Sequence, residues 1–503
     1  MQTNVLEYLE ETVKVHPHKI AFTDGQDSLT FREVYDQARA IGSWLAAKGI
    51  TGQSVAVLMN KHPRTVTAFL GSIYGGNYYV PLDPEMPPQR MECILKKTKA
   101  KILLCDETTQ ECGQLLHFGG QAIAYTQAAF GIIQEDVLRK IRNAQLDIDP
   151  IYIVFTSGST GVPKGVVGCH RSVIDYIEHL CPVLDFREDT VFGNQTPLFV
   201  DACLKEILPT LKLGATLYLI PKKLFLFPVL LVEYLNQNKI NTLCWVVSAL
   251  TLISSLGTFE KAVPQWVHTV AFASEVFPIR QLKLWRQALP EARFINLYGP
   301  TETTGICCYY EVDRDFDERD ILPIGKPLPN TQVLLLNEQG RQVANGEAGE
   351  ICIRGTRLTL GYFMEPERTE AAFVQNPLNP LYPDKIYRTG DLGQYNERGE
   401  LLFLSRKDHQ IKHMGHRIEL GEIEAAAASC AQVQNVGCVY QEERKKIILY
   451  YAGSLSASEL TVFLRNKLQR FMLPNVIRQL DSMPTLPNGK LDRTRLSQYS
   501  EES

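Results

Sequence analysis

A glycine-rich segment that follows a run of strand-forming residues carries the clearest chemical signal in the sequence. Residues 152–155 read Tyr-Ile-Val-Phe, and residues 156–165 read Thr-Ser-Gly-Ser-Thr-Gly-Val-Pro-Lys-Gly. Glycines let a backbone turn sharply and aim successive N–H groups at one anion, and hydroxyl groups donate to phosphate oxygens. The lysine adds a mobile positive charge for a polyphosphate. We therefore predict a strand followed by a phosphate-binding loop, whose contacts come from Thr156, Ser157, Gly158, Ser159, Thr160, Gly161 and Lys164.

This segment departs from the common P-loop pattern. Pro163 stands where that pattern has a glycine before the lysine, and Lys164 is followed by Gly165 instead of Ser or Thr. A flexible surface loop with a solvated lysine is the alternative interpretation. The position of this particular string directly after a strand favours phosphate binding.

Two further segments offer groups suited to a nucleotide. Residues 296–304 read Asn-Leu-Tyr-Gly-Pro-Thr-Glu-Thr-Thr, which supplies an amide for a base edge, an aromatic ring for stacking, a hydroxyl and a carboxylate able to hold Mg²⁺. Asp391, within the turn Tyr-Arg-Thr-Gly-Asp-Leu at 387–392, could accept hydrogen bonds from both hydroxyls of a ribose. Taken alone, each segment is more typical of an ordinary turn, with a capping Thr in the first and an Asp that satisfies its own backbone in the second.

The composition is that of a globular protein and argues against several classes. A chain of 503 residues with 45% hydrophobic and 21% charged residues predicts two or more domains. The net charge of −4 gives no electrostatic reason to expect nucleic acid or an anionic membrane as a partner. The N-terminal residues lack a signal-peptide pattern, and the most apolar run, 224–232, is too short to span a bilayer. The twelve cysteines form no Cys-x-x-Cys pair, so we expect reduced thiols in the cytoplasm.

Strand-like and helical segments alternate along roughly the first 325 residues, which predicts parallel α/β layers. The expected strands include 55–59, 102–105, 216–220, 242–247 and 293–297. The expected helices include 34–48, 172–184, 229–238 and 278–288. After residue 325, turn residues separate short strands, which indicates an antiparallel sheet or a small barrel. A compact ending of helices and strands follows a boundary near 405–408.

The three chemical segments together resemble the adenylate-forming superfamily, which includes acyl-CoA synthetases and luciferases. The likeness is strongest to the amino-acid adenylation domains of nonribosomal peptide synthesis. It rests also on Pro-Asn-Gly-Lys-Leu-Asp-Arg at 487–493. Further matching strings occur in order along the chain, at 79–83, 349–355, 361–363, 415–424 and 471–474. Each string is short, but their joint order and spacing extend over essentially the whole chain.

The resemblance implies an α/β fold with two domains and a reaction in two halves. Residues 1–407 would form a large N-terminal domain of two α/β subdomains plus a small β-barrel, and residues 408–503 a small mobile α+β C-terminal domain. In the first half-reaction a carboxylate attacks the α-phosphate of ATP, giving an acyl-adenylate and pyrophosphate. The acyl group then passes to the phosphopantetheine thiol of a carrier protein. Asp408 matches the hinge about which the small domain rotates between the halves, although an ordinary turn cap explains it too.

The resemblance also assigns roles to single residues. The loop at 156–164 holds the β- and γ-phosphates, Thr301 touches the α-phosphate, and Glu302 holds Mg²⁺. Lys490 bridges the substrate carboxylate and the α-phosphate, where its charge brings two anions together. Taken alone, Lys490 in a Pro-Asn-Gly turn would be a solvated surface residue. The nucleoside is expected to contact Ala273, Asn296, Tyr298, Gly299, Asp391, Arg406 and Phe403, the last being equally explained as a core residue.

The segment Phe-Val-Asp-Ala-Cys-Leu-Lys-Glu-Ile at 199–207 resembles the substrate segment of the family, with Asp201 at the aspartate that pairs with an α-ammonium group. The implied substrate is therefore an α-amino or imino acid. Lys205 is unusual, because a lysine in an otherwise apolar pocket is costly unless it is paired. It could meet an acidic or polar substrate side chain, such as that of glutamate, or it could extend outward or pair with Glu206. The implied pocket is formed by Asp201, Ala202, Lys205, Trp245, Val270, Phe272, Leu297, Gly305 and Ile306.

Three positions depart from the family pattern without removing a chemical role. Val200 replaces an aromatic residue or histidine, Val247 replaces a proline, and Ala273-Ser274 stands in a turn that is usually Gly-Gly. No Gly-Gly-x-Ser phosphopantetheine site follows Arg493, so we expect the carrier protein to be a separate chain. The alternatives to an amino-acid adenylation domain are a D-alanine–carrier protein ligase, an acyl- or aryl-CoA ligase, and a catalytically silent nucleotide-binding relative.

Overall fold

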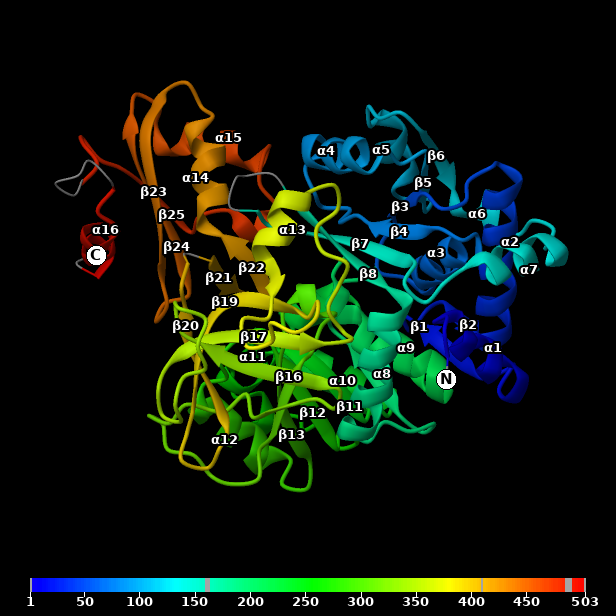
Figure 1. The fold of residues 1–503 in the computed structure, drawn as a ribbon, viewed down its shortest axis with the longest axis horizontal. Coiled ribbons are helices and arrows are strands. Elements are labelled where there is room, and N and C mark those ends of the chain that lie inside the picture. Colours follow the sequence, from blue (N-terminus) through cyan, green and yellow to red (C-terminus); the bar gives the residue numbers. More distant parts are fainter. Residues whose placement is uncertain (1, 159–162, 409, 485–490, 502–503) are drawn as a thin grey trace.

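The computed structural model describes residues 2–158, 163–408, 410–484 and 491–501. Ser159, Thr160, Gly161 and Lys490, for which we predict phosphate or carboxylate contacts, lie outside these residues. Figure 1 shows the early part of the chain, blue to cyan, next to a second α/β unit in green. The yellow strands lie beside the green unit, and the orange and red C-terminal elements lie on the side away from the N-terminus.

A six-stranded sheet forms the centre of the first α/β unit, in the order β6-β5-β3-β4-β7-β8. The first five of these strands are parallel, and β8 returns antiparallel to β7. Every residue of β3 is buried, as expected for a central parallel strand. The strands are β3 (Ser54–Leu58), β4 (Tyr78–Pro81), β5 (Ile102–Cys105), β6 (Gln121–Ala124), β7 (Pro150–Thr156) and β8 (Lys164–Cys169). The helices in this part of the chain are α2 (Phe31–Ala47), α3 (Pro63–Tyr74), α4 (Pro88–Thr98), α5 (Gln110–Leu115), α6 (Tyr125–Ala129) and α7 (Glu135–Ala144).

A nine-stranded sheet forms the second unit, in the order β15-β14-β13-β12-β11-β9-β10-β1-β2. The run from β13 to β1 is parallel, so the carboxyl ends of these strands meet at one edge. The strands are β1 (Ile20–Thr23), β2 (Ser28–Thr30), β9 (Val191–Asn194), β10 (Thr216–Leu219), β11 (Thr242–Val246), β12 (Thr269–Ala273), β13 (Arg293–Tyr298), β14 (Cys308–Glu311) and β15 (Lys326–Pro327). The helices are α1 (Leu6–Val15), α8 (His170–Leu184), α9 (Leu204–Leu213), α10 (Pro228–Gln237), α11 (Val247–Ser255) and α12 (Ile279–Ala288).

The rest of the chain forms smaller, mainly antiparallel sheets. A five-stranded sheet contains β16 (Thr331–Leu336), β17 (Gly349–Gly355), β18 (Phe373–Gln375), β19 (Lys385–Tyr395) and β20 (Leu401–Arg406), with α13 (Pro366–Ala372) beside it. The hairpin β21 (Gln410–His413) and β22 (His416–Glu419) then leads directly into α14 (Leu420–Ala428). The C-terminal elements are β23 (Val433–Gln441), β24 (Lys446–Gly453), α15 (Ala457–Arg465), β25 (Val476–Gln479) and α16 (Arg493–Glu501).

The α/β class predicted from the sequence is confirmed, and the structure corrects one local expectation. Lys164 is not in a loop, because β8 begins at Lys164, which pairs with Thr156 of β7. Gly165 lies close beneath Ile153 and Phe155, where a side chain would clash. Only a residue without a side chain fits at Gly165, and the neighbouring Lys164 is buried, with its ammonium donating to Glu302 over 3.1 Å.

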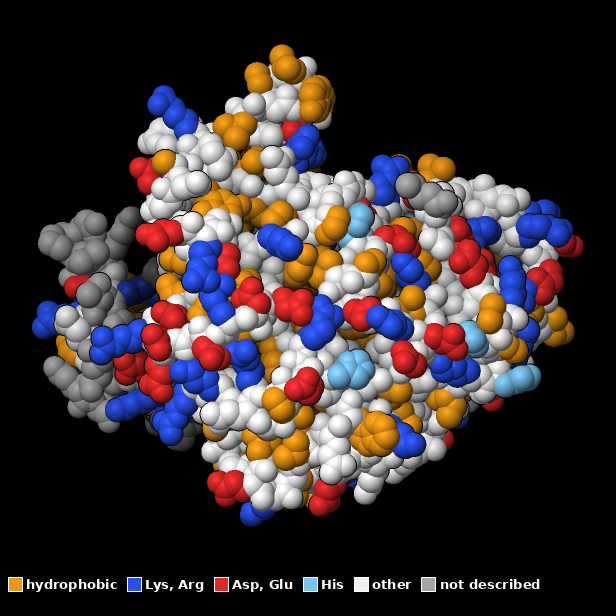
Figure 2. Space-filling model, turned by 90° about the horizontal axis from the view of Figure 1, so that it is seen from below, with side chains coloured by type: hydrophobic (Ala, Val, Ile, Leu, Met, Phe, Trp, Pro, Cys, Tyr) orange, Lys and Arg blue, Asp and Glu red, His pale blue; other side chains and the backbone are white. Residues whose placement is uncertain are grey.

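Charged side chains of both signs intermix over the molecular face shown in Figure 2. Among the helices of the described ranges, none is long and apolar enough to cross a bilayer. Each of the twelve cysteines lies in a described range and is a free thiol, and Cys93 on α4 is the exposed one.

Candidate active site

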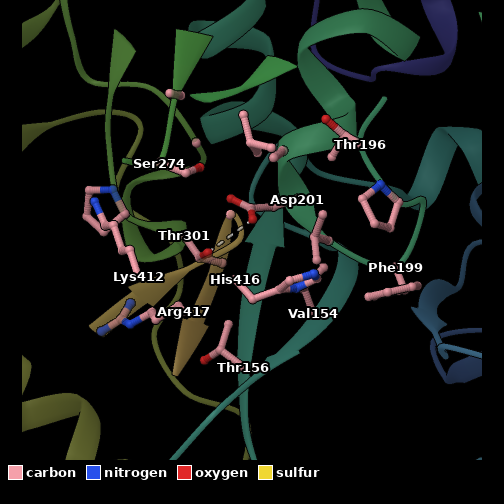
Figure 3. A pocket seen from close by; sticks show the side chains of 18 of the residues that line it. Val154, Thr156, Thr196, Phe199, Asp201, Ser274, Thr301, Lys412, His416 and Arg417 are labelled. Carbon is pink, nitrogen blue, oxygen red and sulfur yellow. Dashed lines mark hydrogen bonds between the residues drawn. The ribbon is translucent and has the colours of Figure 1, made fainter. Parts of the chain in front are cut away.

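A cavity of about 210 Å³ lies where the carboxyl ends of parallel strands from both large sheets meet the hairpin β21–β22. Segments that follow β4, β7, β9, β11, β12 and β13 contribute to its wall. Open α/β sheets commonly bind ligands at such an edge. Figure 3 shows side chains from these segments and from the hairpin facing one another across the cavity.

Asp201 supplies a buried carboxylate in this cavity. It begins a short 3₁₀ turn (Asp201–Cys203) before α9 and is 8% exposed. The Thr301 hydroxyl, which follows β13, donates to Asp201 Oδ1 over 3.0 Å, the contact dashed in Figure 3. Burial raises the pKa of Asp201 from 3.8 to about 6, against the hydrogen bond from Thr301. A buried carboxylate with so little local compensation suits a positively charged ligand group.

Lys205 lies in the first turn of α9, four residues after Asp201, and lines the same cavity. Its ammonium group is buried and donates to the carbonyl of Ala202 over 2.9 Å and to Thr196 Oγ1 over 3.2 Å. Glu206 accepts from the Asn194 amide over 2.5 Å, and among the described residues no carboxylate oxygen lies within ion-pair distance of the Lys205 ammonium, although its charge opposes the burial-induced rise in the pKa of both Glu206 and Asp201. Lys205 therefore neither extends to solvent nor pairs with Glu206. Its direct hydrogen bonds are to neutral acceptors, while Asp201 and Glu206 lie close enough to feel its charge.

Lys61 contacts the backbone next to the cavity, and the sequence analysis did not identify it as a candidate. It follows β3, and its buried ammonium donates to the carbonyls of Asn194 over 2.8 Å, Gln195 over 3.1 Å and Ile220 over 3.3 Å. Burial lowers the pKa of Lys61 and raises that of Glu206 nearby. These bonds fix the ends of two strands of the nine-stranded sheet against the first α/β unit. The only signal in the sequence is a lysine just after a buried strand.

Glu302 lies at the centre of a compact group of charges. It is fully buried, and its Oε1 accepts from Lys164 Nζ over 3.1 Å and from the Tyr362 hydroxyl over 2.8 Å. Its Oε2 accepts from Arg417 Nη1 of β22 over 2.8 Å. Burial by itself would raise the pKa of Glu302, but Arg417 and Lys164 outweigh it and hold that pKa well below its usual value. Glu302 is therefore a carboxylate that stays ionised in the interior.

The residues predicted to hold a nucleoside form a second polar group at the cavity. The Tyr298 hydroxyl donates to Asp391 Oδ2 over 2.5 Å, and Arg406 pairs with Asp391 and, over 2.7 Å, with Asp408. The rings of Tyr298 and Phe403 lie 6.5 Å apart between centroids. Asp391 is thus oriented by two donors and keeps lone pairs for further ones.

Lys412 of β21 lies over the same two rings and was missed by the sequence reasoning. Its Nζ is 5.5 Å from the ring centroid of Tyr298 and 5.8 Å from that of Phe403. Burial lowers the pKa of Lys412, although Asp391 opposes this. The side chain lines the cavity and is labelled in Figure 3. Lys412, Arg417 and His416 show that the hairpin completes the wall of the site.

The structure brings most of the predicted residues to the cavity, but not all. Those that line it are Thr156, Ser157, Asp201, Ala202, Lys205, Trp245, Ala273, Tyr298, Gly299, Thr301, Gly305, Ile306, Asp391 and Arg406. Three predicted pocket residues are buried in the core and do not line the cavity, namely Val270, Phe272 and Leu297. Val270 and Phe272 are two positions apart on β12, so they share one face of the sheet and pack into the same core.

The remaining predicted residues lie near the cavity without lining it. Asn296 does not line the cavity, and its amide donates to the carbonyl of Pro323 over 2.8 Å. The others that do not line it are Gly158, Lys164, Glu302, Phe403 and Asp408. Ser274 belongs to the turn in which the sequence has Ala-Ser where the family usually has Gly-Gly. It lines the cavity, and its φ of +76° is a conformation that favours glycine. A non-glycine residue therefore holds a left-handed backbone conformation at the cavity wall.

Comparison with protein families matches residues 9–363 to the AMP-binding enzyme family. This match extends over more than half of the chain, so the protein belongs to the AMP-binding enzyme family. A D-alanine–D-alanyl carrier protein ligase of Bacillus licheniformis is 30% identical over 98% of this chain and 99% of that protein. Bacitracin synthase 1 of Bacillus licheniformis is 31% identical over 97% of this chain. The chain spans only 9% of that synthase and 14% of surfactin synthase subunit 1 of Bacillus subtilis, to which it is 30% identical.

Solved structures agree with the fold. Holo-PA1221, an NRPS protein containing adenylation and PCP domains, superposes with a TM-score of 0.83 and 25% identity over 99% of this chain and 84% of that one. The Vibrio cholerae adenylation domain AlmE, in complex with glycyl-adenosine-5'-phosphate, gives a TM-score of 0.84 over 100% of this chain and 98% of that one. The two sequences are 21% identical, so this likeness shows the fold alone.

Proposed function

We propose that the protein activates an α-amino acid with ATP to an aminoacyl-adenylate and passes the aminoacyl group to the phosphopantetheine thiol of a separate carrier protein. The observation that carries the proposal is the buried Asp201 carboxylate, which faces the same cavity as the Tyr298, Asp391 and Arg406 group. An acyl substrate without an amino group would leave Asp201 unpaired in the interior, which is costly. An α-ammonium group satisfies it.

In the proposed first half-reaction, Asp201 holds the α-ammonium group while the substrate carboxylate attacks the α-phosphorus of ATP. A new carboxylate–phosphorus bond forms, and the bond to the pyrophosphate oxygen breaks. The Thr301 hydroxyl donates to Asp201, and we assign it to the α-phosphate contact on the basis of the family motif. Lys490 would neutralise the two approaching anions. In the second half-reaction the carrier thiol attacks the acyl carbon, AMP leaves, and the thiol proton is lost.

The residues present fit the Mg²⁺ that ATP chemistry requires. Glu302 is buried yet held ionised, which is the state needed for a hard cation. No cluster of three or more His, Cys, Asp or Glu side chains forms a metal site among the described residues, so the remaining ligands would be phosphate oxygens and water. When bound, Mg²⁺ supplies charge neutralisation for the phosphates. Glu302 is the residue of this chain that would hold it.

Lys205 supports a substrate with an acidic or strongly polar side chain. Its ammonium lines the same cavity as Asp201 and makes its hydrogen bonds to neutral oxygens, without a carboxylate at ion-pair distance among the described residues. A side-chain carboxylate such as that of glutamate would form a charge-assisted hydrogen bond with this ammonium. A D-alanine substrate is the second candidate, because the D-alanine–D-alanyl carrier protein ligase aligns over 99% of its own length. An exchange panel that contains both amino acids separates these candidates.

Replacing Lys205 by methionine should remove the preference for an acidic side chain. We expect kcat/KM for the preferred acidic amino acid to fall about 10²-fold, since a charge-assisted hydrogen bond contributes about 1.5–3 kcal/mol. The value for an apolar amino acid should rise or stay the same. The check is amino-acid-dependent pyrophosphate exchange across a panel, with Lys212→Met on the same helix as control. Equal losses for acidic and aliphatic substrates would contradict a specificity role.

The pH profile of amino-acid activation should report the ionisation of Asp201. Since burial raises its pKa to about 6, Asp201 is protonated in the free protein at acidic pH and charged above pH 6. Only the charged form attracts an α-ammonium, so kcat/KM for the amino acid should increase as pH rises through about 6 and then level off. Measurement between pH 5 and 8 tests this. A flat profile, or the same rise in Asp201→Asn, would count against it.

A further inference from the structure

We propose that Glu206 is held as a neutral carboxylic acid in a reciprocal hydrogen-bonded pair with Asn194, and that its ionisation weakens the preference of the cavity for a substrate with a negatively charged side chain. This role rests on the proposed function, since it concerns how the pocket around Lys205 selects a side chain. The acid–amide pair itself follows from contacts in the core next to the cavity, whatever the substrate is.

Two buried oxygen atoms beside the cavity have no hydrogen-bond partner among the described residues. They are Oε1 of Glu206, on α9, and Oδ1 of Asn194, the last residue of β9. Both side chains are fully buried, and the Asn194 amide donates to the other Glu206 oxygen, Oε2, over 2.5 Å. Unpartnered acceptors on two groups that already touch are costly, because each has lost its hydrogen bonds to water without replacement.

A proton on Oε1 of Glu206 would satisfy both oxygen atoms. An ionised carboxylate only accepts hydrogen bonds, whereas a carboxylic acid also donates one. While the Asn194 amide donates to Oε2, the acid O–H would donate to Asn194 Oδ1 and close a ring of two hydrogen bonds. Burial acts in the same direction, since it raises the pKa of the Glu206 carboxyl from 4.5 to about 7. Below pH 7 the protonated acid is therefore the favoured form.

The other titratable groups that face Glu206 are two thiols and two ammonium groups. The thiols are Cys203, in the turn before α9, and Cys244 of β11, and burial raises the pKa of both well above the usual value, so they stay neutral. The charges of Lys205 and Lys61 oppose the rise in the pKa of Glu206. Neither lysine donates to its carboxyl, because Lys61 donates to three backbone carbonyls and Lys205 to one carbonyl and one hydroxyl.

The neutral acid leaves the charge of Lys205 available to the substrate side chain. Lys205 is the neighbour of Glu206 in α9, and its charge is the largest electrostatic influence on the Glu206 carboxyl. An ionised Glu206 would place a negative charge beside Lys205 and repel a substrate carboxylate at the same wall, whereas an aliphatic side chain would feel no such repulsion. Glu206 does not line the cavity itself, so it determines specificity through Lys205 without touching the substrate.

Infrared spectroscopy of the full chain tests the acid–amide pair without any substrate. The carbonyl stretch of a carboxylic acid is separate from the amide and carboxylate bands. Lowering the pH from about 8.5 to about 6 should add such a band in wild type and in Asp201→Asn, and Glu206→Gln should lack one carboxyl group's share of it. The matched control is Glu233→Gln, which removes an exposed glutamate of α10 and should keep the wild-type band.

Two results of this comparison would overturn the proposal. One is a pH-dependent band in Glu206→Gln that equals the band of wild type. The other is a Glu206→Gln protein that does not fold, because the glutamine amide reproduces both hydrogen bonds of the neutral acid.

Pyrophosphate exchange as a function of pH tests the specificity role. For an aliphatic amino acid, kcat/KM should level off above pH 6, as expected from Asp201 alone. For an acidic amino acid it should fall again by about tenfold between about pH 7 and 8.5, and Glu206→Gln should abolish this fall. A fall that persists in Glu206→Gln, or that aliphatic amino acids share, would overturn the role. No exchange with any amino acid would reject the proposed function and this role together, while the infrared band would still decide the state of Glu206.

Discussion

Replacing Asp201 by alanine is expected to lower amino-acid-dependent pyrophosphate exchange by about 10²- to 10³-fold. The α-ammonium group would enter a buried site without its counter-charge, and loss of one partner of a buried ion pair costs about 3–5 kcal/mol. The loss should appear in kcat/KM for the amino acid, while the KM for ATP should change little, because the nucleoside residues Tyr298 and Asp391 are untouched.

Two controls make the Asp201 result specific. Asp313→Ala alters an acid that hydrogen-bonds Tyr310, outside the cavity lining, and should leave exchange unchanged. In the wild-type protein, acyl or aryl acids without an amino group should support less exchange than amino acids. Full exchange in Asp201→Ala, or activity with acids that lack an amino group, would favour an acyl- or aryl-CoA ligase.

Replacing Lys490 by alanine is expected to separate the two half-reactions. Formation of the adenylate should fall by about 10²-fold or more, because two anions must then approach without the cation that stabilises their transition state. Thioester formation from a pre-made aminoacyl-adenylate should remain near the wild-type rate. Single-turnover assays of each half, with Lys467→Ala on the same domain as control, measure the difference. An unimpaired first half-reaction would remove Lys490 from the mechanism.

In this structure the residues that follow Lys490 lie away from the cavity. Arg493 pairs with Glu424 of α14, and Leu491 lies against Gly437 of β23. None of the described residues 491–501 lines the cavity, whereas Gly415, His416 and Arg417 of the hairpin do. The hairpin is thus the part of the small domain at the site in this conformation. We propose that a rotation about the predicted hinge at Asp408 exchanges it for the segment that carries Lys490.

The parts of the site that lie on continuous segments could be predicted from the sequence. Asp201 and Thr301 each belong to a short string that resembles a family motif, and the structure places both strings after strands of the nine-stranded sheet, at one edge. The predicted helices and strands of both α/β units are found within a few residues. Phosphate contacts by Ser159 to Gly161 and the bridging role of Lys490 stay predictions.

The parts that depend on distant contacts could not be predicted in the same way. Arg417 meets Glu302 across 115 positions, Tyr362 meets it across 60, and Lys61 reaches the Asn194 carbonyl across 133. No local pattern distinguishes such a lysine or arginine from a surface residue. Val270 and Phe272 do not line the cavity, and their pocket roles stay predictions. Alternation along β12 turns both side chains into a core that contains Trp285 and Phe277.

The most direct test of the proposed function is ATP–pyrophosphate exchange by the wild-type protein with the twenty amino acids, D-alanine and β-alanine. We expect exchange that depends on an α-amino acid and is strongest with an acidic or strongly polar side chain, because Asp201 and Lys205 line the same cavity. Exchange with aliphatic amino acids alone would contradict the role of Lys205. No exchange with any amino acid, with ATP still bound, would contradict the function as a whole.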